Sequence, residues 1–368
     1  MHSSNIKFLP QVDHLRAFAA IWIVLYHGFQ IIGSVARSGE QFSGKWIYSK
    51  NFVYSAILEG HSAVALFMTL SGFIFTYGAF GKAVNYRGFI KNRMLRIYPM
   101  YVVVLACAVV TSQFPFSMSR FISSILPFAD VYSIQGTPFM AVSWAVAVEL
   151  QFYLLFPVIL LFLNKTSFVT ILFIIVGTIL LRSLCVLLGM SMHDAAYWHI
   201  MGRMDQFAIG VAAAVLLRKY RVGKYSAAIG LACSVMLVVT MLQIFNRLGG
   251  WPSTGMWRLI WPSVEGVVYS SLIYFYVSSN LFEGGMVSNA LCRVGECSFS
   301  IYLLHFPIVK YFSDPRFLGF ATGRPFFETC VLVVFVVVPV VIAVSFVTYR
   351  IIERPFLRRR VRYTSSAA

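Results

Sequence analysis

The chain has 368 residues, of which 59% are hydrophobic and only 12% are charged, and its mean hydropathy is +0.78. Soluble domains carry about 25% charged residues, so this composition excludes a soluble enzyme, a disordered chain and a fibrous protein, and predicts a polytopic membrane protein. The net charge is +17. In a membrane protein lysine and arginine mark the cytoplasmic side and lie against anionic lipids, so we expect membrane lipids and no nucleic acid as partners.

Ten apolar segments follow one another along the chain, and most reach the roughly 20 residues that a helix needs to cross the hydrocarbon. They cover residues 11–34, 56–80, 97–113, 141–163, 167–189, 204–217, 225–246, 258–279, 297–312 and 327–350. In lipid, only helices satisfy their own backbone hydrogen bonds without the alternating pattern of a barrel. The sequence therefore predicts an all-α bundle of about ten transmembrane helices, with residues 1–368 forming one integral membrane domain.

Basic residues set the expected orientation of these helices. With both termini in the cytoplasm, the clusters at 82–96, 218–224 and 350–362 all fall on one side, as the positive-inside rule requires. Residues 355–368 then form a basic cytoplasmic tail. Residues 34–36 could serve as a signal-peptide cleavage site, but Asp13 and Arg16 interrupt the preceding apolar run, so we expect the first segment to be retained.

The first segment carries Arg16 and, 11 residues later, His27. This spacing is within about 20° of a whole number of helical turns and spans about 16 Å. Both side chains therefore share one face, with Arg16 at the cytoplasmic edge and His27 deep in the membrane. Asp13 lies one turn before Arg16 and can pair with it. The alternative is a snorkelling arginine and a histidine that only packs.

Two further segments carry charged side chains with regular spacing. Arg93 and Arg96 lie on one face where the third helix begins. Guanidinium groups bind phosphate through a bidentate fork, although the pair could also simply mark the cytoplasmic side. In the fourth segment Glu149 lies about 9 Å below the outer edge and Tyr153 one turn deeper on the same face. A buried carboxylate needs a partner.

The later segments add a second set of polar residues. Arg203 and Asp205 precede or open the sixth segment, and Ser298, Tyr302 and His305 form a polar stripe on the ninth. The other ionisable or hydroxyl candidates in apolar segments are His61, Ser71, Arg182 and Glu265. Any one of them alone could be a polar contact between helices. The six cysteines lack metal-ligand spacing, and we expect no metal.

The predicted depths divide the candidates into two groups. The group at middle to outer depth is His27, Glu149 and His305, and the basic group on the inner side is Arg16, Arg93, Arg96 and Arg293. This division predicts a polar cavity through the bundle, with a basic cytoplasmic mouth and an acid–base set further in. The helices could also be arranged so that these residues never meet.

Taken together, these motifs resemble the acyltransferase-3 family of integral membrane acyltransferases, from residue 10 to about 356. The defining element is Arg16 followed by His27. The others are Ser71-Gly72-Phe73, Arg93-x-x-Arg96-Ile97-Tyr98-Pro99, Ser143-Trp144, Glu149-x-x-Phe152-Tyr153-x-x-Phe156-Pro157, Arg203-x-Asp205-x-Phe207-x-x-Gly210, the Ser298–His305 stripe and Glu353-Arg354-Pro355. Ala65 stands where many relatives carry an acidic residue, so no role is given to an acid there.

The resemblance implies transfer of an acyl group, commonly acetyl, from cytoplasmic acyl-coenzyme A to a hydroxyl of an extracytoplasmic carbohydrate or glycolipid. Exopolysaccharide and lipopolysaccharide are typical acceptors, and a bacterial inner membrane is the implied location. Some relatives carry a fused esterase-like domain, and this chain ends at residue 368 without one. We therefore expect any protein that receives the acceptor to be separate. The oligomeric state is not predicted.

The resemblance also suggests a mechanism, in which His27 deprotonates the acceptor hydroxyl and Glu149 orients the imidazole. Tyr153, Tyr302 or His305 would donate to the developing oxyanion. The residues expected to bind the phosphates of the donor are Arg16, Arg93, Arg96 and Arg293, and the supporting residues are Asp13, His61, Ser71, Arg203 and Asp205. The alternatives are a covalent acyl-enzyme on His27 or Ser71, and a transporter that carries out no chemistry.

Overall fold

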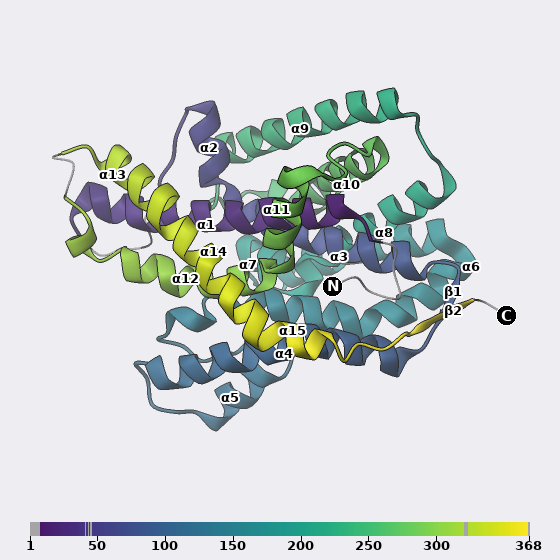
Figure 1. The fold of residues 1–368 in the computed structure, drawn as a ribbon, viewed down its shortest axis with the longest axis horizontal. Helices are drawn as coiled ribbons and strands as arrows, with labels where there is room; N and C mark the ends of the chain where they lie inside the picture. The colour runs from purple at the N-terminus through teal and green to yellow at the C-terminus, as the bar shows by residue number, and fades with distance from the viewer. Residues whose placement is uncertain (1–7, 41, 43, 45, 320–322, 367–368) are drawn as a thin grey trace.

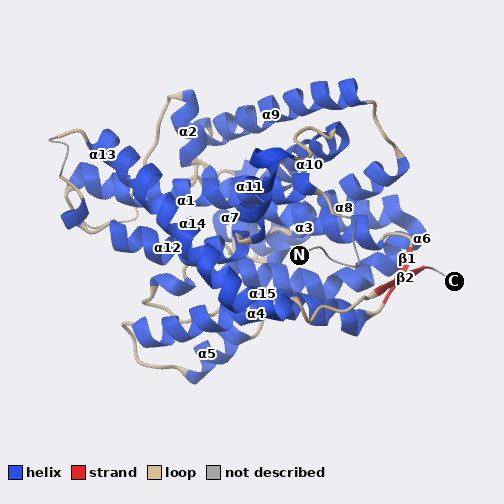
Figure 2. Ribbon diagram, in the orientation of Figure 1, coloured by secondary structure: helices blue, strands red, loops and turns tan. Residues whose placement is uncertain are grey.

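The computed structural model describes residues 8–366 except 41, 43, 45 and 320–322. The described chain is almost entirely helical (Figures 1 and 2). The α-helices are α1 (Pro10–Ser38), α2 (Phe52–Leu58), α3 (Ala63–Ala79), α4 (Tyr86–Thr111), α5 (Met118–Ile125), α6 (Ser143–Leu187), α7 (Met192–Tyr197), α8 (Met204–Lys219), α9 (Lys224–Arg247), α10 (Trp261–Ser279), α11 (Gly285–Glu296), α12 (Ser298–Phe312), α13 (Pro325–Leu332), α14 (Val338–Thr348) and α15 (Arg354–Leu357).

Short turns and two strands complete the element list. The 3₁₀ turns are η1 (Gly60–Ser62), η2 (Pro138–Met140), η3 (Ile200–Gly202), η4 (Met256–Leu259) and η5 (Pro315–Phe317), the π-helical segments are η6 (Val333–Val337) and η7 (Tyr349–Glu353), and the strands are β1 (Lys82–Val84) and β2 (Thr364–Ser366). The prediction of a helical membrane protein is therefore confirmed.

Each of the ten apolar segments coincides with helix, but two boundaries differ from the prediction. Segments 141–163 and 167–189 join in α6, where Thr166 is the residue with non-helical angles (φ −140°, ψ 64°). The third segment is only the second half of α4, which begins at Tyr86 because the Asn85 side chain accepts a hydrogen bond from the Gly88 amide. Its charged first half gave no apolar signal.

Six helical stretches in the described part of the chain are long and apolar enough to cross a membrane. They are Pro10–Ser38, Gly60–Ala79, Tyr86–Thr111, Pro138–Leu187, Lys224–Arg247 and Pro325–Leu357. The protein is thus an integral membrane protein. The total of about ten crossing helices and the position of the termini stay predictions.

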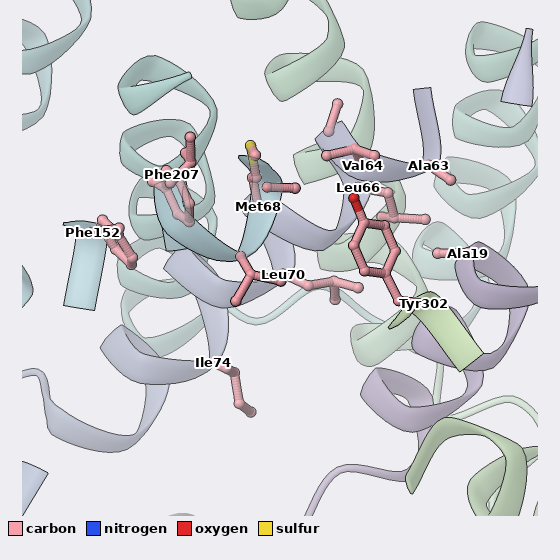
Figure 3. Packing of buried hydrophobic residues seen from close by; sticks show 14 of the residues in the cluster. Ala19, Ala63, Val64, Leu66, Met68, Leu70, Ile74, Phe152, Phe207 and Tyr302 are labelled. Atoms are coloured by element: carbon pink, nitrogen blue, oxygen red, sulfur yellow. The ribbon is translucent and has the colours of Figure 1, made fainter. Parts of the chain in front are cut away.

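Helix α3 lies at the centre of the bundle and is apolar on all sides, as expected for a helix surrounded by others. Figure 3 shows its side chains from Ala63 to Ile74 between Phe152 and Phe207 at one end and Tyr302 and Ala19 at the other. The rings of Phe152 and Phe207 stack with centroids 3.9 Å apart. Helices α1, α6, α8, α10 and α12 therefore share one core.

Small residues let α3 and α8 approach each other closely. A β-carbon at Gly72 would overlap the carbonyl oxygen of Phe207, and one at Gly210 would overlap that of Thr69. The two glycines thus form reciprocal contacts between the same two helices, which is the usual way in which membrane helices achieve tight packing.

The last described segment folds back onto the body of the protein. Residues 325–357 form one helical run that contains both π-helical segments. The chain then passes from α15 beside α4 to β2, which pairs antiparallel with β1 and sets Ala83 opposite Ser365 (Figure 1). The described part of the predicted basic tail is therefore packed against the first half of α4.

Candidate active site

A cavity of about 220 Å³ opens among the ends of α1, α3, α4, α6, α11 and α12. Four arginines, three acidic residues, three tyrosines and two serines line it. These polar residues are Asp13, Arg16, Arg93, Arg96, Glu149, Tyr153, Glu296, Tyr302 and Arg360, together with Ser71, Ser298 and Tyr349. The remaining wall is apolar, with Met68, Ile74 and Phe75 of α3 among its members.

Two of the four arginines are engaged by carboxylates. Arg16 donates to Asp13 at 3.2 Å, which confirms the predicted pairing one helical turn apart. Arg96 donates to Glu353 at 3.0 Å and to the main-chain oxygen of Glu296 at 3.2 Å. Glu353 also accepts from the Ser300 hydroxyl and is fully buried. Segment η7 places Glu353 here, and such π-segments commonly occur at functional sites.

Arg93 differs from these two. Its guanidinium lies over the rings of Phe75 and Phe89, at 4.6 and 5.5 Å from their centroids, and 5.8 Å from that of Tyr153. It is 9% exposed, its Nε atom has no hydrogen-bond partner, and no carboxylate of the described residues lies within ion-pair distance. A buried charge without a counter-ion is costly, so this position favours an anionic ligand.

Arg360 is the fourth arginine of the cavity. Burial and the nearby guanidinium groups of Arg93, Arg96 and Arg16 lower the pKa of Arg360 to about 9. This pKa is still above neutrality, so the side chain keeps its charge at pH 7 and the four guanidinium groups repel one another. The repulsion falls when an anion binds among them.

Glu149 occupies the inner wall of the cavity. Its Oε1 atom accepts hydrogen bonds from the Ser71 hydroxyl at 2.9 Å and from the hydroxyl of Tyr153, one turn along α6. Tyr302 faces the same space from α12, and its hydroxyl donates to the main-chain oxygen of Val142 at 3.2 Å. The cavity thus joins a basic end to an acidic and phenolic end.

Two histidines form a hydrogen-bonded pair next to Tyr302. The Nδ1 atom of His305 lies 2.6 Å from the main-chain oxygen of Tyr302, and its Nε2 atom lies 3.0 Å from Nδ1 of His27. A carbonyl oxygen only accepts, so Nδ1 of His305 carries a hydrogen. With both rings neutral, His305 Nε2 accepts from His27 Nδ1, and Nε2 of His27 keeps its lone pair as a proton acceptor.

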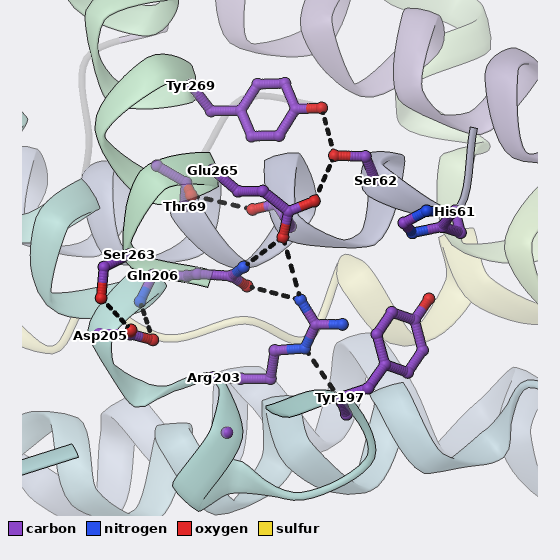
Figure 4. Close-up of polar contacts among 12 residues, drawn as sticks. His61, Ser62, Thr69, Tyr197, Arg203, Asp205, Gln206, Ser263, Glu265 and Tyr269 are labelled. Carbon is purple, nitrogen blue, oxygen red and sulfur yellow. Dashed lines mark hydrogen bonds and ion pairs between the residues drawn. The ribbon is translucent and has the colours of Figure 1, made fainter. Parts of the chain in front are cut away.

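A buried polar network lies away from this cavity, between η1, α8 and α10 (Figure 4). Glu265 accepts from Ser62 at 2.6 Å and from Gln206 at 2.9 Å, and its carboxylate lies 3.4 Å from Arg203. Arg182 and Asp205 form a second ion pair at 2.9 Å with no exposed surface. These charges are partnered by protein groups, so the network joins helices and holds no free acid or base for chemistry.

The family model described as "Acyltransferase domain" matches residues 9–350. The chain belongs to the acyltransferase-3 family. The match runs from the start of α1 into η7 and includes every residue that lines the cavity except Phe8, Leu357 and Arg360. The prediction of an acyltransferase from the spacing of its motifs is confirmed at the level of the family.

The chain is also similar to two kinds of staphylococcal protein. O-acetyltransferase OatA of Staphylococcus aureus is 22% identical over 393 residues, which cover 96% of this chain and 58% of the relative. Putative O-acetyltransferase SACOL0978 of S. aureus strain COL is 22% identical over 401 residues, 97% of this chain and 59% of the relative. The chain therefore spans about three fifths of the length of these relatives. No solved structure matches it.

The partner of His27 is not the predicted one. Glu149 contacts Ser71 and Tyr153 in the cavity, whereas His27 contacts His305, and neither histidine lines the cavity. The reason is the rotation of α1, which packs this face of the helix against α12. The hydrogen-bond partner of His27 is therefore His305 in place of Glu149, and Tyr302, which contacts His305 through its main-chain oxygen, lines the cavity.

The predicted oxyanion donors are also engaged elsewhere. Tyr153 donates its only hydroxyl hydrogen to Glu149, Tyr302 donates its own to Val142, and His305 uses Nδ1–H for the Tyr302 carbonyl. A phenol or a neutral imidazole has one hydrogen to give. In this conformation none of the three side chains has a hydrogen left for an oxyanion, because each already donates to a main-chain or carboxylate oxygen.

The structure separates the remaining predicted residues into two groups. Asp13 and Ser71 lie at the cavity, while Arg293 is exposed on α11 outside it. His61, Arg203 and Asp205 lie in the region of the buried network, with His61 3.2 Å from Glu59. Arg293 lies in the last turn of α11, where a basic residue interacts favourably with the helix dipole.

Sequence reasoning missed two residues of the site, Arg360 and Glu353. Glu353 belongs to one of the motifs quoted for the family. It directly follows a long apolar segment, and this position could have predicted a buried carboxylate that needs a partner. Arg360 follows two other arginines in the tail. Nothing in the sequence distinguishes it from Arg358 or Arg359, because only the path of the chain after α15 brings it to the cavity.

Proposed function

We propose that this protein moves an acetyl group from acyl-coenzyme A to a hydroxyl of a carbohydrate acceptor on the other side of a bacterial cytoplasmic membrane. The observation that carries the proposal is the cavity itself, which joins four arginines to an inner wall that touches the His27–His305 pair through Tyr302. The O-acetyltransferase names of the bacterial relatives support acetyl as the transferred group.

The donor fits the cavity in one direction. Coenzyme A carries phosphates at one end and a thioester at the other, so its phosphates belong with Arg93 and the neighbouring guanidinium groups. The uncharged arm then runs inward along Met68, Ile74 and Phe75 and brings the thioester toward Tyr302. This direction leaves the reacting carbonyl at the inner end, near the histidines.

Contacts between loops support the proposed sidedness. Loops expected on the cytoplasmic side meet one another: Arg218 donates to the main-chain oxygen of Phe80 at 2.6 Å, and β1 pairs with β2. Loops expected on the outer side also meet, since the Tyr48 hydroxyl donates to the main-chain oxygen of Gly249 at 3.3 Å. The basic end of the cavity lies with the first group, where a cytoplasmic donor would enter.

The acceptor would arrive from the opposite side. A shallow hollow there is lined by Trp46, Tyr48, His193 and Trp251. Trp46 stacks on Tyr26 with centroids 5.8 Å apart and rings nearly parallel, and Tyr26 precedes His27 in α1. Flat aromatic surfaces with polar edges suit an amphipathic ligand such as a sugar ring. In this proposal the acceptor binds at the hollow, and its hydroxyl reaches Nε2 of His27 from that side.

The chemistry follows from the direction of the histidine hydrogen bonds. Nε2 of His27 takes the proton of the acceptor hydroxyl as its oxygen attacks the thioester carbonyl. His305 accepts from Nδ1 of His27 and so stabilises the imidazolium that forms. The carbon–sulfur bond then breaks, the new carbon–oxygen ester bond remains, and the proton passes from His27 to the leaving thiolate. No metal or redox partner is needed to balance the step.

The decisive experiment compares the glycans of cells that produce the wild-type protein with those that produce His27→Ala, by mass spectrometry of acyl groups. His199→Ala is the matched control, because His199 is a histidine that contacts Asp130 and not the cavity. We expect acetylation with the wild type and the control and none with His27→Ala at equal membrane abundance. Full acetylation by His27→Ala would refute the mechanism.

A further inference from the structure

The charges around the cavity are not evenly compensated. Arg16 has Asp13 and Arg96 has Glu353, but neither Arg93 nor Arg360 has a carboxylate of the described residues within ion-pair distance. The Nε atoms of Arg93 and Arg360 are both buried without a hydrogen-bond partner. Two guanidinium groups from distant parts of the chain thus share one cavity, and no carboxylate among the residues that the structure describes forms an ion pair with either of them.

Arg360 reaches this place because the segment around it is fixed at several points. We name residues 358–366 the strap. The Asn92 side chain forms two hydrogen bonds with the main chain of Val361: its Nδ2 atom donates to the carbonyl oxygen at 2.7 Å, and its Oδ1 atom accepts from the amide at 2.9 Å. Tyr363 is 3% exposed and meets Phe89 edge-on with centroids 5.3 Å apart. Beyond it, β2 pairs with β1.

The attachments lie on both sides of Arg360. Leu357 is buried and lines the cavity just before it, and Val361 is bound to Asn92 directly after it. Arg358 and Arg359 are exposed, so the strap turns one of its three consecutive arginines inward. Burial of an arginine beside other arginines is unfavourable. The strap attachments therefore hold Arg360 in a position that only a bound anion makes favourable.

We propose that Arg360 is a phosphate-binding residue of the donor site, placed there by the docked strap, and that it makes the enzyme select thioesters that carry phosphates. The inference rests on the proposed function, since it takes the donor to be acyl-coenzyme A. Arg360 and Arg93 face the same space from the tail and from α4, so each can offer a bidentate fork to a phosphate group. Docking of the strap and binding of the donor then favour each other.

The test measures binding of coenzyme A by titration calorimetry to the full-length protein in lipid nanodiscs. Arg360→Ala is expected to weaken binding about tenfold or more, as for other charge-assisted contacts, while Arg360→Lys loses less. Arg358→Ala is the matched control, because Arg358 is exposed in the same strap and is outside the cavity. Binding of coenzyme A to Arg360→Ala with wild-type affinity would overturn the inference.

A truncated donor separates binding of phosphate from a general effect on the fold. S-acetyl-N-acetylcysteamine carries the thioester but no phosphate, so Arg360→Ala should turn it over with the wild-type kcat/KM while losing kcat/KM on acetyl-coenzyme A. Equal losses on both donors would overturn the inference. Wild-type protein that acetylates an acceptor from neither donor and does not bind coenzyme A would instead refute the proposed function.

The strap attachments provide a second, independent variant. Asn92→Ala removes both hydrogen bonds to Val361 without touching the cavity wall. It should reproduce much of the affinity loss of Arg360→Ala, and the double variant should bind coenzyme A no more weakly than Arg360→Ala alone. Additive losses in the double variant would show that the strap does not act through Arg360.

Discussion

Replacement of His305 tests the histidine pair directly. In His305→Ala, Nδ1 of His27 loses the acceptor that lies 3.0 Å away and that fixes its tautomer. Nε2 of His27 is then no longer held as the lone-pair atom, and the imidazolium formed during proton transfer has no partner. In His305→Gln a side-chain amide oxygen can accept from Nδ1 in place of the imidazole nitrogen, so part of the activity should return.

The expected magnitude follows from the change in the strength of this hydrogen bond. A bond between neutral groups contributes about 0.5–1.5 kcal/mol, and one to a charged group about 1.5–3 kcal/mol. The difference of about 1–1.5 kcal/mol corresponds to roughly a 5- to 13-fold loss of rate, and loss of the fixed tautomer adds to it. We therefore expect kcat of His305→Ala to fall about 10- to 100-fold, as for other orienting partners of histidine.

His27→Ala should lose about 10²- to 10⁴-fold, because the proton acceptor itself is gone. If His305 acts only through His27, the double variant with His27→Ala and His305→Ala should have the same activity as His27→Ala alone. The assay is release of the coenzyme A thiol by protein in nanodiscs, with KM for the donor and thermal stability measured alongside. Multiplied losses in the double variant, or wild-type kcat in His305→Ala, would refute the pairing.

Three further outcomes test the arginines and the helix packing. Arg93→Ala should raise the donor KM about tenfold with little change in thermal stability, because it removes a guanidinium that has no carboxylate counter-ion among the described residues. An unchanged KM would contradict this. Arg96→Ala should cost about 3–5 kcal/mol of stability, since it leaves Glu353 buried and unpaired, and a wild-type melting temperature would argue against it. Gly72→Ala should lower the melting temperature through overlap with α8, whereas Gly177→Ala, with open space around it, should not.

Much of the local geometry could be predicted from the sequence. Helical periodicity set Arg16 one turn from Asp13, and Glu149 one turn from Tyr153, and both contacts are present. These pairs lie within single helices, where 3.6 residues per turn fix which side chains meet. The apolar segments also lie in helices, and six of these helical stretches in the described part of the chain are long and apolar enough to cross a membrane.

Contacts between helices were predicted less well. Glu149 and His27 lie at compatible depths in their helices, yet their partners are Ser71 and His305, 78 and 278 residues away. Depth along a helix follows from its residue count, but rotation about its axis depends on how neighbours pack. The alternation that marks an amphipathic helix in water is weak in α3 and α12, since lipid and protein interior are both apolar.

The amino-acid order by itself determined a helical integral membrane protein with the motifs of the acyltransferase-3 family, because composition and intrahelical spacing are local properties. The tertiary structure decided that His305 accepts from His27, that Glu149 belongs to the cavity wall, and that Arg360 returns from the tail to the site. These outcomes depend on the rotation and crossing of helices, and on a chain path after α15 that is set by the Asn92 and Phe89 side chains of a different helix.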